Sequence, residues 1–240
     1  MPYLNWISDD AIKLEVKRIL DTASSGILSA SDSFHKNVID PFAVIFEMSG
    51  FGIDTVDQWE ITEKSRKAQK TLSNAFGIFH QKVLGHVDGW QDLGTGKSAD
   101  LLCEDKKVLA EVKNKFNTVK GSDQVKVYDH LDSLVMPIAS RYKDYTAYYV
   151  EIIPKPKGGK SQVYNVPFTP SDNETKQPRP TNELIRKIDG KSFYELVTGE
   201  AHALESLYSE LPQIIYDITG NKLKETEHAA ILNYFKIAFN

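Results

Sequence analysis

The segment KSADLLCEDKKVLAEVKNKF, residues 97–116, contains two short apolar runs separated by the charged sequence EDKK. The runs ADLLC and VLAEVKNKF have the composition of strands, and the charged residues between them are typical of a tight connection. The segment therefore predicts a β-hairpin. The carboxylates and the ammonium group inside these runs require an explanation, because a charge in a partly buried strand is costly unless it is paired.

The length of the connection predicts the register of this hairpin. If EDKK is a tight connection, Cys103 lies opposite Val108, and counting outward along both strands places Asp100 opposite Glu111. Directly opposed Cβ atoms are about 4.5–5.5 Å apart. Strand alternation places Lys113 on the same face as Glu111. A connection of even length produces this match, whereas an odd one or a bulge would displace it.

Two carboxylates placed this closely either share a proton or bind a cation. Oxygen ligands suit Mg²⁺, which keeps several waters and is often held by one or two carboxylates and a phosphate. The carboxylates of Asp100 and Glu111 and the backbone carbonyl of Val112 are the candidate metal ligands. Lys113 would orient or activate the attacking water, or stabilise charge on the phosphate. The pattern predicts hydrolysis of phosphodiester bonds, with Asp100, Glu111 and Lys113 as the catalytic residues.

The tripeptide acid–any residue–lysine is a weak signal when it is taken alone. It occurs five times, at residues 15–17, 104–106, 105–107, 111–113 and 189–191. The first copy lies on an amphipathic helical pattern, and three others lie in turn-like sequence. The copy at 111–113 differs because it lies in an expected strand with an aspartate placed across from it. In the alternative interpretation, these acids only make salt bridges.

The composition of 41% hydrophobic and 26% charged residues is that of a globular protein, and 240 residues suffice for one large domain or two small ones. The sequence contains no run of about 18 apolar residues, so no membrane span is expected. The N-terminus lacks the features of a secretory signal, so a cytoplasmic protein is expected. Cys103 is the single cysteine, which excludes an internal disulfide framework and a cysteine-rich zinc site. The six histidines have no ligand-like spacing, which argues against zinc.

The net charge of −4 gives no general indication of nucleic-acid binding, but the charge is unevenly distributed. Residues 155–191 contain eight basic and four acidic residues. Such a strip can be an anion-facing surface or a set of scattered solvated lysines. Within it, residues 155–183 are polar and rich in proline and glycine, which predicts a loop and a possible DNA-recognition element.

The periodicity changes along the chain from helical to extended and back to helical. This order predicts a single α/β domain over residues 1–240, with a central mixed sheet flanked by helices. The longest helical run has an apolar stripe of Ala68, Leu72, Phe76, Phe79 and Val83. Helices are expected at 8–22, from near Pro41 to Gly50, at 62–85 and 122–136, and near 192–198, 201–218 and 225–238, with strands at ADLLC, VLAEVKNKF and 145–154.

Asp100, Glu111 and Lys113 resemble the D, E and K of the PD-(D/E)XK nuclease superfamily. The proline that usually precedes the aspartate is Ala99 here, a departure that does not affect the ligands. The resemblance implies a restriction-endonuclease-like fold. It also implies a contribution from the long helix before the hairpin, because this helix often contributes to the active sites of the superfamily.

Other stretches resemble a narrower family, the type II restriction endonucleases that cut GGNCC or GGWCC. These stretches are NVIDPF (37–42), FHQKVLGHVDGW (79–90) and IRKIDGKSFYELVTG (185–199). The resemblance implies a Mg²⁺-dependent homodimer that hydrolyses both strands of double-stranded DNA at a short palindromic site. It also implies a cognate DNA methyltransferase, as a functional partner and not as part of a complex.

The helix before the hairpin offers supporting candidates. Asn74 and Gln81 are seven residues apart and lie on one helical face, and Gln81 could hold a water at the site. His80 is adjacent, and Glu47 is a further acid that could support the site. The alternative is a surface amide and a histidine satisfied at the edge of the core.

Two further groups are candidates for DNA contacts. The sequence NKFNTVKGSDQVK surrounds an expected helix start, where lysines and backbone N–H groups commonly bind phosphates. The loop TPSDNETKQPRP is the candidate for base readout, because arginine or lysine can bind guanine and an acid can accept from cytosine. The alternatives are a solvated helix cap and a merely flexible loop. The candidates are Lys115, Asn117, Lys120, Ser122, Gln124 and Lys126 in the first group and Asp172, Lys176 and Arg179 in the second.

Three functions follow from these patterns. The first is a sequence-specific, Mg²⁺-dependent DNA endonuclease. The second keeps the same active site in a repair or recombination nuclease that recognises DNA structure. The third is a DNA-binding or interaction module without catalysis.

Overall fold

A computed structural model describes residues 1–32, 34, 38–94, 96–155, 164–172, 175–222 and 224–239. The chain divides into two compact units. The first consists of Met1–Glu15 with Gly77–Asn240, and the second is Val16–Phe76. The expectation of a single domain over 1–240 remains a prediction. None of the helices in the described ranges is long and apolar enough to cross a membrane.

The first unit is built on a six-stranded mixed sheet of order β1-β2-β3-β4-β6-β5. Strands β3, β4 and β6 run parallel to one another, and the pairs β1–β2, β2–β3 and β5–β6 are antiparallel. The mixed α/β sheet flanked by helices confirms the fold class expected from the sequence. The strands are β1 (Gln91–Asp92), β2 (Leu101–Cys103), β3 (Val108–Lys115), β4 (Thr146–Ile153), β5 (Asn165–Pro167) and β6 (Ile185–Asp189).

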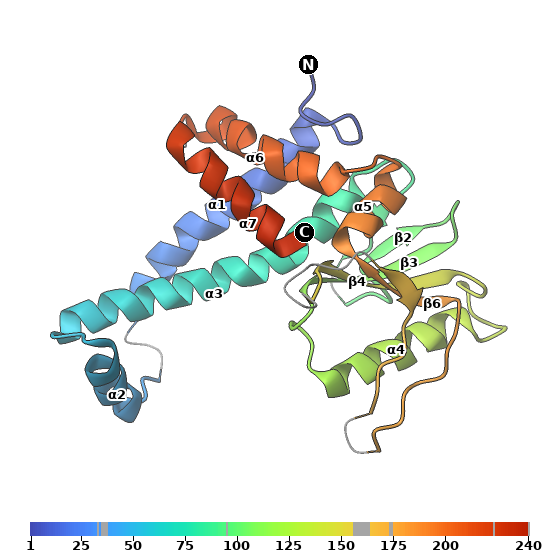
Figure 1. The fold of residues 1–240 in the computed structure, drawn as a ribbon, viewed down its shortest axis with the longest axis horizontal. Helices are drawn as coiled ribbons and strands as arrows, with labels where there is room; N and C mark the ends of the chain where they lie inside the picture. The colour runs from blue at the N-terminus through green and yellow to red at the C-terminus, as the bar shows by residue number, and fades with distance from the viewer. Residues whose placement is uncertain are drawn as a thin grey trace. The chain divides into compact units, whose positions relative to one another are not determined.

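Helices cover both faces of this sheet, with α4 on one side and α5 on the other (Figure 1). The α4 side contains an apolar core in which Tyr128, Leu131 and Val135 pack against Leu109 and Tyr149. The helices are α1 (Asp9–Asp32), α2 (Pro41–Phe51), α3 (Val56–Gly85), α4 (Gly121–Val135), α5 (Gly190–Thr198), α6 (Ala203–Thr219) and α7 (Glu225–Phe239).

Two strands were not anticipated from the sequence. Residues 185–189, for which no element was predicted, form β6. The segment 155–183, expected to be mostly loop, contains the three-residue strand β5 and an isolated bridge between Ser171 and Pro178. Strand β5 is short and lies at the sheet edge, where a proline such as Pro167 is tolerated because no further strand needs its missing N–H.

The long helices of the second unit are less buried than the sequence predicts. Helices α1 and α3 extend beyond the expected ranges 8–22 and 62–85. In the stripe predicted for α3, only Phe79 and Val83 are buried, and both lie in the first unit. Phe76 is exposed, and Leu72 is only partly covered. A helical stripe shows which residues share a face, but not whether another element covers that face.

Candidate active site

The hairpin has the predicted register: Cys103 pairs with Val108 and Leu101 with Ala110. The ladder ends there, so Asp100 is not a ladder partner of Glu111 as the register argument expected. The backbone N–H of Asp100 donates to the carbonyl of Ala110 at 3.0 Å. Its carboxylate Oδ2 accepts from the backbone N–H of Val112 at 2.7 Å. The Asp100 carboxylate thus accepts the hydrogen bond that a backbone carbonyl of β2 would accept if the ladder continued.

Asp100 lies in the electrostatic field of both other predicted catalytic residues. Burial and the negative charge of Glu111 raise the pKa of Asp100 to about 6, against the opposing effects of the Val112 N–H and the Lys113 ammonium. The Nζ of Lys113 lies 2.6 Å from Oε1 of Glu111, and both side chains are partly exposed. The structure therefore brings all three residues together alongside the middle of β3.

The backbone of Val112 also faces this group. In an antiparallel pair, the N–H and the C=O of one residue point toward the same neighbouring strand. Because the N–H of Val112 bonds to Asp100, its carbonyl points to the same side of β3. Two carboxylates and one backbone oxygen are thus available on one edge of the hairpin.

Gln81 supports the backbone of this group and not its carboxylates. The side chain is buried, and its Nε2 donates to Oδ1 of Asp92 and, at 3.3 Å, to the carbonyl of Asp100. Asp92 also pairs with Lys82. A Cβ on Gly85 would lie 2.6 Å from the Cβ of Asp92, so a glycine is required where α3 meets β1.

The other supporting candidates have different partners. Nδ1 of His80 lies 2.8 Å from the hydroxyl of Tyr194, and burial lowers the pKa of His80 to about 4. Asn74 and Glu47 belong to the second unit. There, Asn74 is exposed, and Glu47 accepts a 2.8 Å hydrogen bond from the indole of Trp59. No described contact links His80 to the hairpin carboxylates.

The first group of DNA candidates forms a continuous stretch from the end of β3 into α4. Lys120 is the N-cap residue of α4, and its side chain makes no capping hydrogen bond. Lys126 pairs with Asp123 at 2.9 Å on the helix surface. Lys115, Asn117, Lys120, Ser122 and Lys126 are exposed, and Gln124 is partly buried.

The second group makes contacts within its own segment and with α4. Arg179 pairs with Asp129 of α4 at 2.6 Å between Nη2 and Oδ2. The carboxylate of Asp172 accepts from the backbone N–H of Thr175 at 2.8 Å. Lys176 has a left-handed φ of 58°. Residues 156–163 and 173–174 of the predicted recognition element, like Asn37 of the NVIDPF stretch, lie outside the described residues.

Sequence reasoning missed the polar residues that extend this site across the sheet. In parallel register, Glu111 pairs with Tyr149 and Lys113 with Glu151, so these side chains share the α4 face. Glu151 is only 1% exposed, and it pairs with Lys187 of β6 at 2.8 Å. The sequence signal was a single glutamate inside the apolar run YTAYYVEIIP.

Two tyrosine hydroxyls lie near Glu151, and among the described residues only one of them makes a hydrogen bond. The hydroxyl of Tyr164 donates to Oε2 of Glu151 at 2.6 Å. The hydroxyl of Tyr149 is buried without a hydrogen-bond partner among the described residues. Burial raises the pKa of Tyr149, and the charges of Glu151 and Glu111 raise it further. Tyr149 therefore remains a protonated donor beside two acids.

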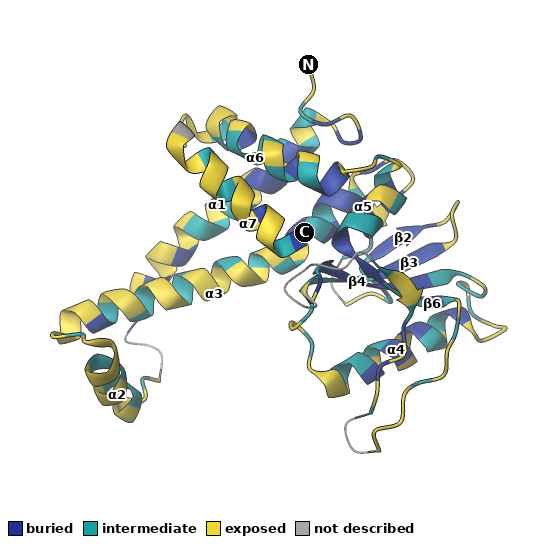
Figure 2. Cartoon of the chain, in the orientation of Figure 1, coloured by how far each residue is buried: buried dark blue, intermediate teal, exposed yellow. Residues whose placement is uncertain are grey.

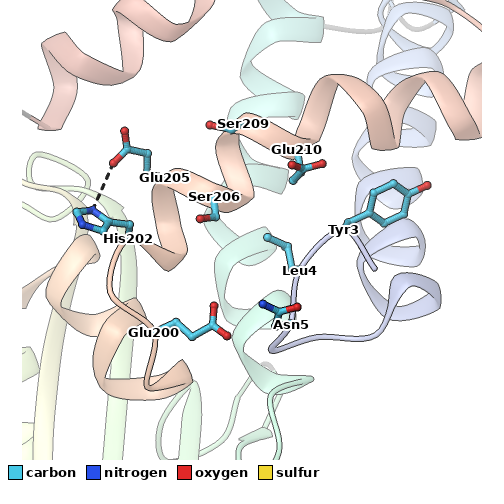
Figure 3. A pocket seen from close by; sticks show the side chains of 9 residues that line it. All are labelled: Tyr3, Leu4, Asn5, Glu200, His202, Glu205, Ser206, Ser209 and Glu210. Atoms are coloured by element: carbon cyan, nitrogen blue, oxygen red, sulfur yellow. Dashed lines mark ion pairs between the residues drawn. The ribbon is translucent and has the colours of Figure 1, made fainter. Parts of the chain in front are cut away.

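A surface pocket of about 510 Å³ lies elsewhere in the first unit (Figure 3). None of the predicted site residues lines it. Figure 3 shows its side chains coming from the N-terminal segment and from the region around α6, with an ion pair between His202 and Glu205. Its three glutamates, Glu200, Glu205 and Glu210, make it unsuited to a DNA phosphate.

Comparison with known proteins agrees with the resemblance noted in the sequence. Residues 4–220 match the family model of the Eco47II restriction endonuclease. The chain is 44% identical to the type II restriction enzyme Eco47II of Escherichia coli over 244 residues, which covers 100% of both chains. It is 31% identical to the type II restriction enzyme Sau96I of Staphylococcus aureus, over 90% of this chain and 80% of that protein. The chain therefore belongs to the Eco47II restriction endonuclease family.

Proposed function

We propose that this protein is a Mg²⁺-dependent type II restriction endonuclease. It would hydrolyse phosphodiester bonds in both strands of double-stranded DNA at a short palindromic site that resembles GGNCC. Membership of the Eco47II family and the names of both relatives support the reaction class. The observation that carries the assignment of the site is the grouping of Asp100, Glu111 and Lys113 on one hairpin edge.

The residues present fit Mg²⁺ by their donor chemistry. The raised pKa of Asp100 means that its anion is unfavourable here until a cation compensates the burial and the charge of Glu111. In the described residues, no three histidine, cysteine or acidic side chains form a metal cluster. The site offers two acidic side chains and not three. Asp100, Glu111 and the Val112 carbonyl would hold Mg²⁺, and water and phosphate oxygens would complete its ligands. When bound, Mg²⁺ supplies positive charge that stabilises the phosphate during hydrolysis.

Lys113 supplies the remaining charge. Its ammonium lies 2.6 Å from Glu111 in the structure, so it is placed beside the carboxylate that would turn toward the cation. Once Glu111 turns, the ammonium would be free to hold the attacking water and to balance negative charge on the phosphate. A positioned charge of this kind typically contributes about 10²–10³-fold to the rate.

DNA binding would involve surfaces on the same side of the sheet as α4. Lys115, Asn117, Lys120, Ser122, Gln124 and Lys126 would contact phosphates, and Asp172, Lys176 and Arg179 would read bases. The ion pair with Asp129 occupies Arg179 in the structure. To read a base, Arg179 would therefore have to leave the carboxylate of Asp129 and bind the guanine edge, which like a carboxylate can accept two hydrogen bonds from one guanidinium group.

A digest of a sequenced plasmid tests this function. We expect discrete fragments in Mg²⁺ and intact plasmid in EDTA, with fragment ends that map to one palindromic sequence. Asp100→Ala and Lys113→Ala should abolish cleavage while sparing specific binding to that sequence. Asp105→Ala is the matched control, because this exposed acid lies in the connection of the same hairpin. Preferential digestion of branched DNA would support a repair nuclease instead, and no cleavage of any DNA would contradict the proposal.

A further inference from the structure

The hydroxyl of Tyr149 is a hydrogen-bond donor that is enclosed in the protein without an acceptor. Tyr149 lies in β4, whose residues from Ala147 to Ile152 are all buried, and it is 0% exposed. Figure 2 shows β4 as a buried strand near the middle of the sheet. The hydroxyl has no hydrogen-bond partner among the described residues. Buried polar groups are rarely left unpaired, and each exception requires an explanation.

Packing fixes the position of this hydroxyl. The Tyr149 ring stacks on Phe168 with a centroid distance of 4.6 Å and an interplanar angle of 6°, and both residues belong to the core that packs against α4. A ring in such a stack cannot turn aside without opening a gap in the core. The C–O bond can still rotate, so the hydroxyl can change the direction in which it donates. An acceptor must therefore come to Tyr149.

Two carboxylates lie beside Tyr149 on the α4 face of the sheet. Glu111 of β3 is its ladder partner, and Glu151 follows two residues later on β4. Residues two apart in a strand point to the same face. Burial raises the pKa of the Tyr149 hydroxyl, and the charges of Glu151 and Glu111 raise it further, so both acids act on this group. These two side chains are the candidate acceptors.

Glu151 already has partners for both of its carboxylate oxygens. Oε2 accepts from the hydroxyl of Tyr164 at 2.6 Å, and Oε1 pairs with the ammonium of Lys187 at 2.8 Å. Glu151 is 1% exposed, so it depends on Lys187 to compensate the burial of its charge. A turn of this carboxylate toward Tyr149 would weaken both contacts, which makes Glu151 the less favourable acceptor.

Glu111 can turn more easily than Glu151. Its side chain is 21% exposed, and its described side-chain contact is the 2.6 Å hydrogen bond from Lys113 to Oε1. In the proposed function, Glu111 turns toward the cation and releases the Lys113 ammonium to the attacking water. The carboxylate then loses the group that orients it in the structure. A hydroxyl fixed beside it can supply that orientation, because a donor to one oxygen leaves the other oxygen available as a ligand.

We propose that Tyr149 is a positioning residue whose hydroxyl donates a hydrogen bond to Glu111 when this carboxylate turns to hold the cation. The inference rests on the proposed function and adds a residue that acts through a metal ligand and not on the DNA. Groups that hydrogen-bond to metal ligands fix their orientation, and removing one typically weakens metal binding by about 10–100-fold. The hydroxyl is thus unpaired while Glu111 pairs with Lys113, and paired once Glu111 holds Mg²⁺.

Metal binding without cleavage tests the inference. The full chain is mixed with a duplex that contains GGACC, and thermal unfolding is followed as Ca²⁺ is added, because Ca²⁺ takes oxygen ligands as Mg²⁺ does. Tyr149→Phe retains the ring that stacks on Phe168. It should raise the Ca²⁺ concentration for half-maximal stabilisation by about 10–100-fold. In EDTA its midpoint of unfolding should be no lower than that of the wild type.

Tyr128→Phe is the matched control for the loss of a hydroxyl. The Tyr128 ring also contacts Phe168, but its hydroxyl donates to the backbone carbonyl of Pro180 at 2.9 Å. This variant should unfold at a lower temperature and respond to the same Ca²⁺ concentration as the wild type. The inference is overturned if Ca²⁺ does not stabilise the wild type, or if Tyr149→Phe has the Ca²⁺ response of the wild type. A lower midpoint of Tyr149→Phe in EDTA would also overturn it, because the hydroxyl would then have a partner without the cation.

Single-turnover cleavage separates positioning from a purely structural role. In Tyr149→Phe the Mg²⁺ concentration that gives half of the maximal rate should rise by about 10–100-fold. The rate at saturating Mg²⁺ should fall by less than about threefold, because the hydroxyl acts on metal binding and not on the reacting atoms. A slower saturating rate with an unchanged Mg²⁺ dependence would contradict the inference. If the Ca²⁺ response depends on Tyr149 but the wild type cleaves no DNA, only the proposed function fails. If the wild type cleaves and Tyr149→Phe responds normally to both metals, only the inference fails.

Discussion

The Asp100 carboxylate accepts a 2.7 Å hydrogen bond from the backbone N–H of Val112, the residue between Glu111 and Lys113. This bond exists because β2 stops pairing at Leu101, which leaves the Val112 N–H without a ladder partner. One backbone contact therefore holds the first acid beside the second acid and the lysine. The arrangement depends on the hairpin itself and not on a flexible loop.

The charge of Asp100 should lower the stability of the metal-free protein at neutral pH. Its pKa rises from 3.8 to about 6 on folding, which corresponds to about 3 kcal/mol at about 1.4 kcal/mol per pKa unit. Because the folded pKa of an acid is raised, stability falls as pH increases from about 4 to about 6 and then levels off. Asp100→Asn should remove this dependence and be more stable in EDTA at pH 8. Urea unfolding of both proteins at pH 4, 6 and 8 measures it, and identical pH profiles would contradict the prediction.

Lys113 should act on cleavage more than on DNA binding. Lys113→Met removes the ammonium beside Glu111, so we expect single-turnover cleavage to fall by about 10²–10³-fold. Binding of specific DNA in Ca²⁺ should change by less than about tenfold, because phosphate contacts elsewhere remain. Lys106→Met is the control from the exposed connection of the hairpin. A loss of binding equal to the loss of cleavage would assign Lys113 to DNA affinity.

Lys187 should stabilise the fold through the buried Glu151. Lys187→Met leaves that carboxylate without its cation and should lower the free energy of unfolding by about 3–5 kcal/mol. The exposed pair Lys17–Asp21 provides the comparison, since Lys17→Met should have a much smaller effect. Chemical denaturation of both variants distinguishes them. Equal effects would mean that Glu151 gains little from its buried partner.

The hydroxyls of Tyr149 and Tyr164 should have opposite effects on stability. Tyr149→Phe removes a buried hydroxyl that lacks a partner, so we expect stabilisation of about 1 kcal/mol, with ring stacking on Phe168 retained. Tyr164→Phe removes a donor to Glu151 and should destabilise by about 1–3 kcal/mol. Thermal unfolding of both variants at one pH compares them directly. A destabilised Tyr149→Phe would show that this hydroxyl has a partner in solution.

The sequence alone determined the hairpin and its register. The even-length connection EDKK and the alternation of apolar residues are local features, and they suffice to pair Cys103 with Val108. The helix start at Pro41 was similarly local, because Asp40 and the proline cap it. Such signals can be read from sequence because all their partners lie within a few residues.

Only the tertiary structure decided the residues whose partners are distant in the chain. Strand β6 contains the charged residue Lys187, and this charge is compensated by Glu151, 36 positions earlier on the neighbouring strand. The position of Gln81 behind Asp100 and the exposure of Phe76 likewise depend on which elements meet. Periodicity reports the face that a residue shares with its neighbours in sequence. What covers that face, and what neutralises a charge on it, is determined by packing between segments far apart in the chain.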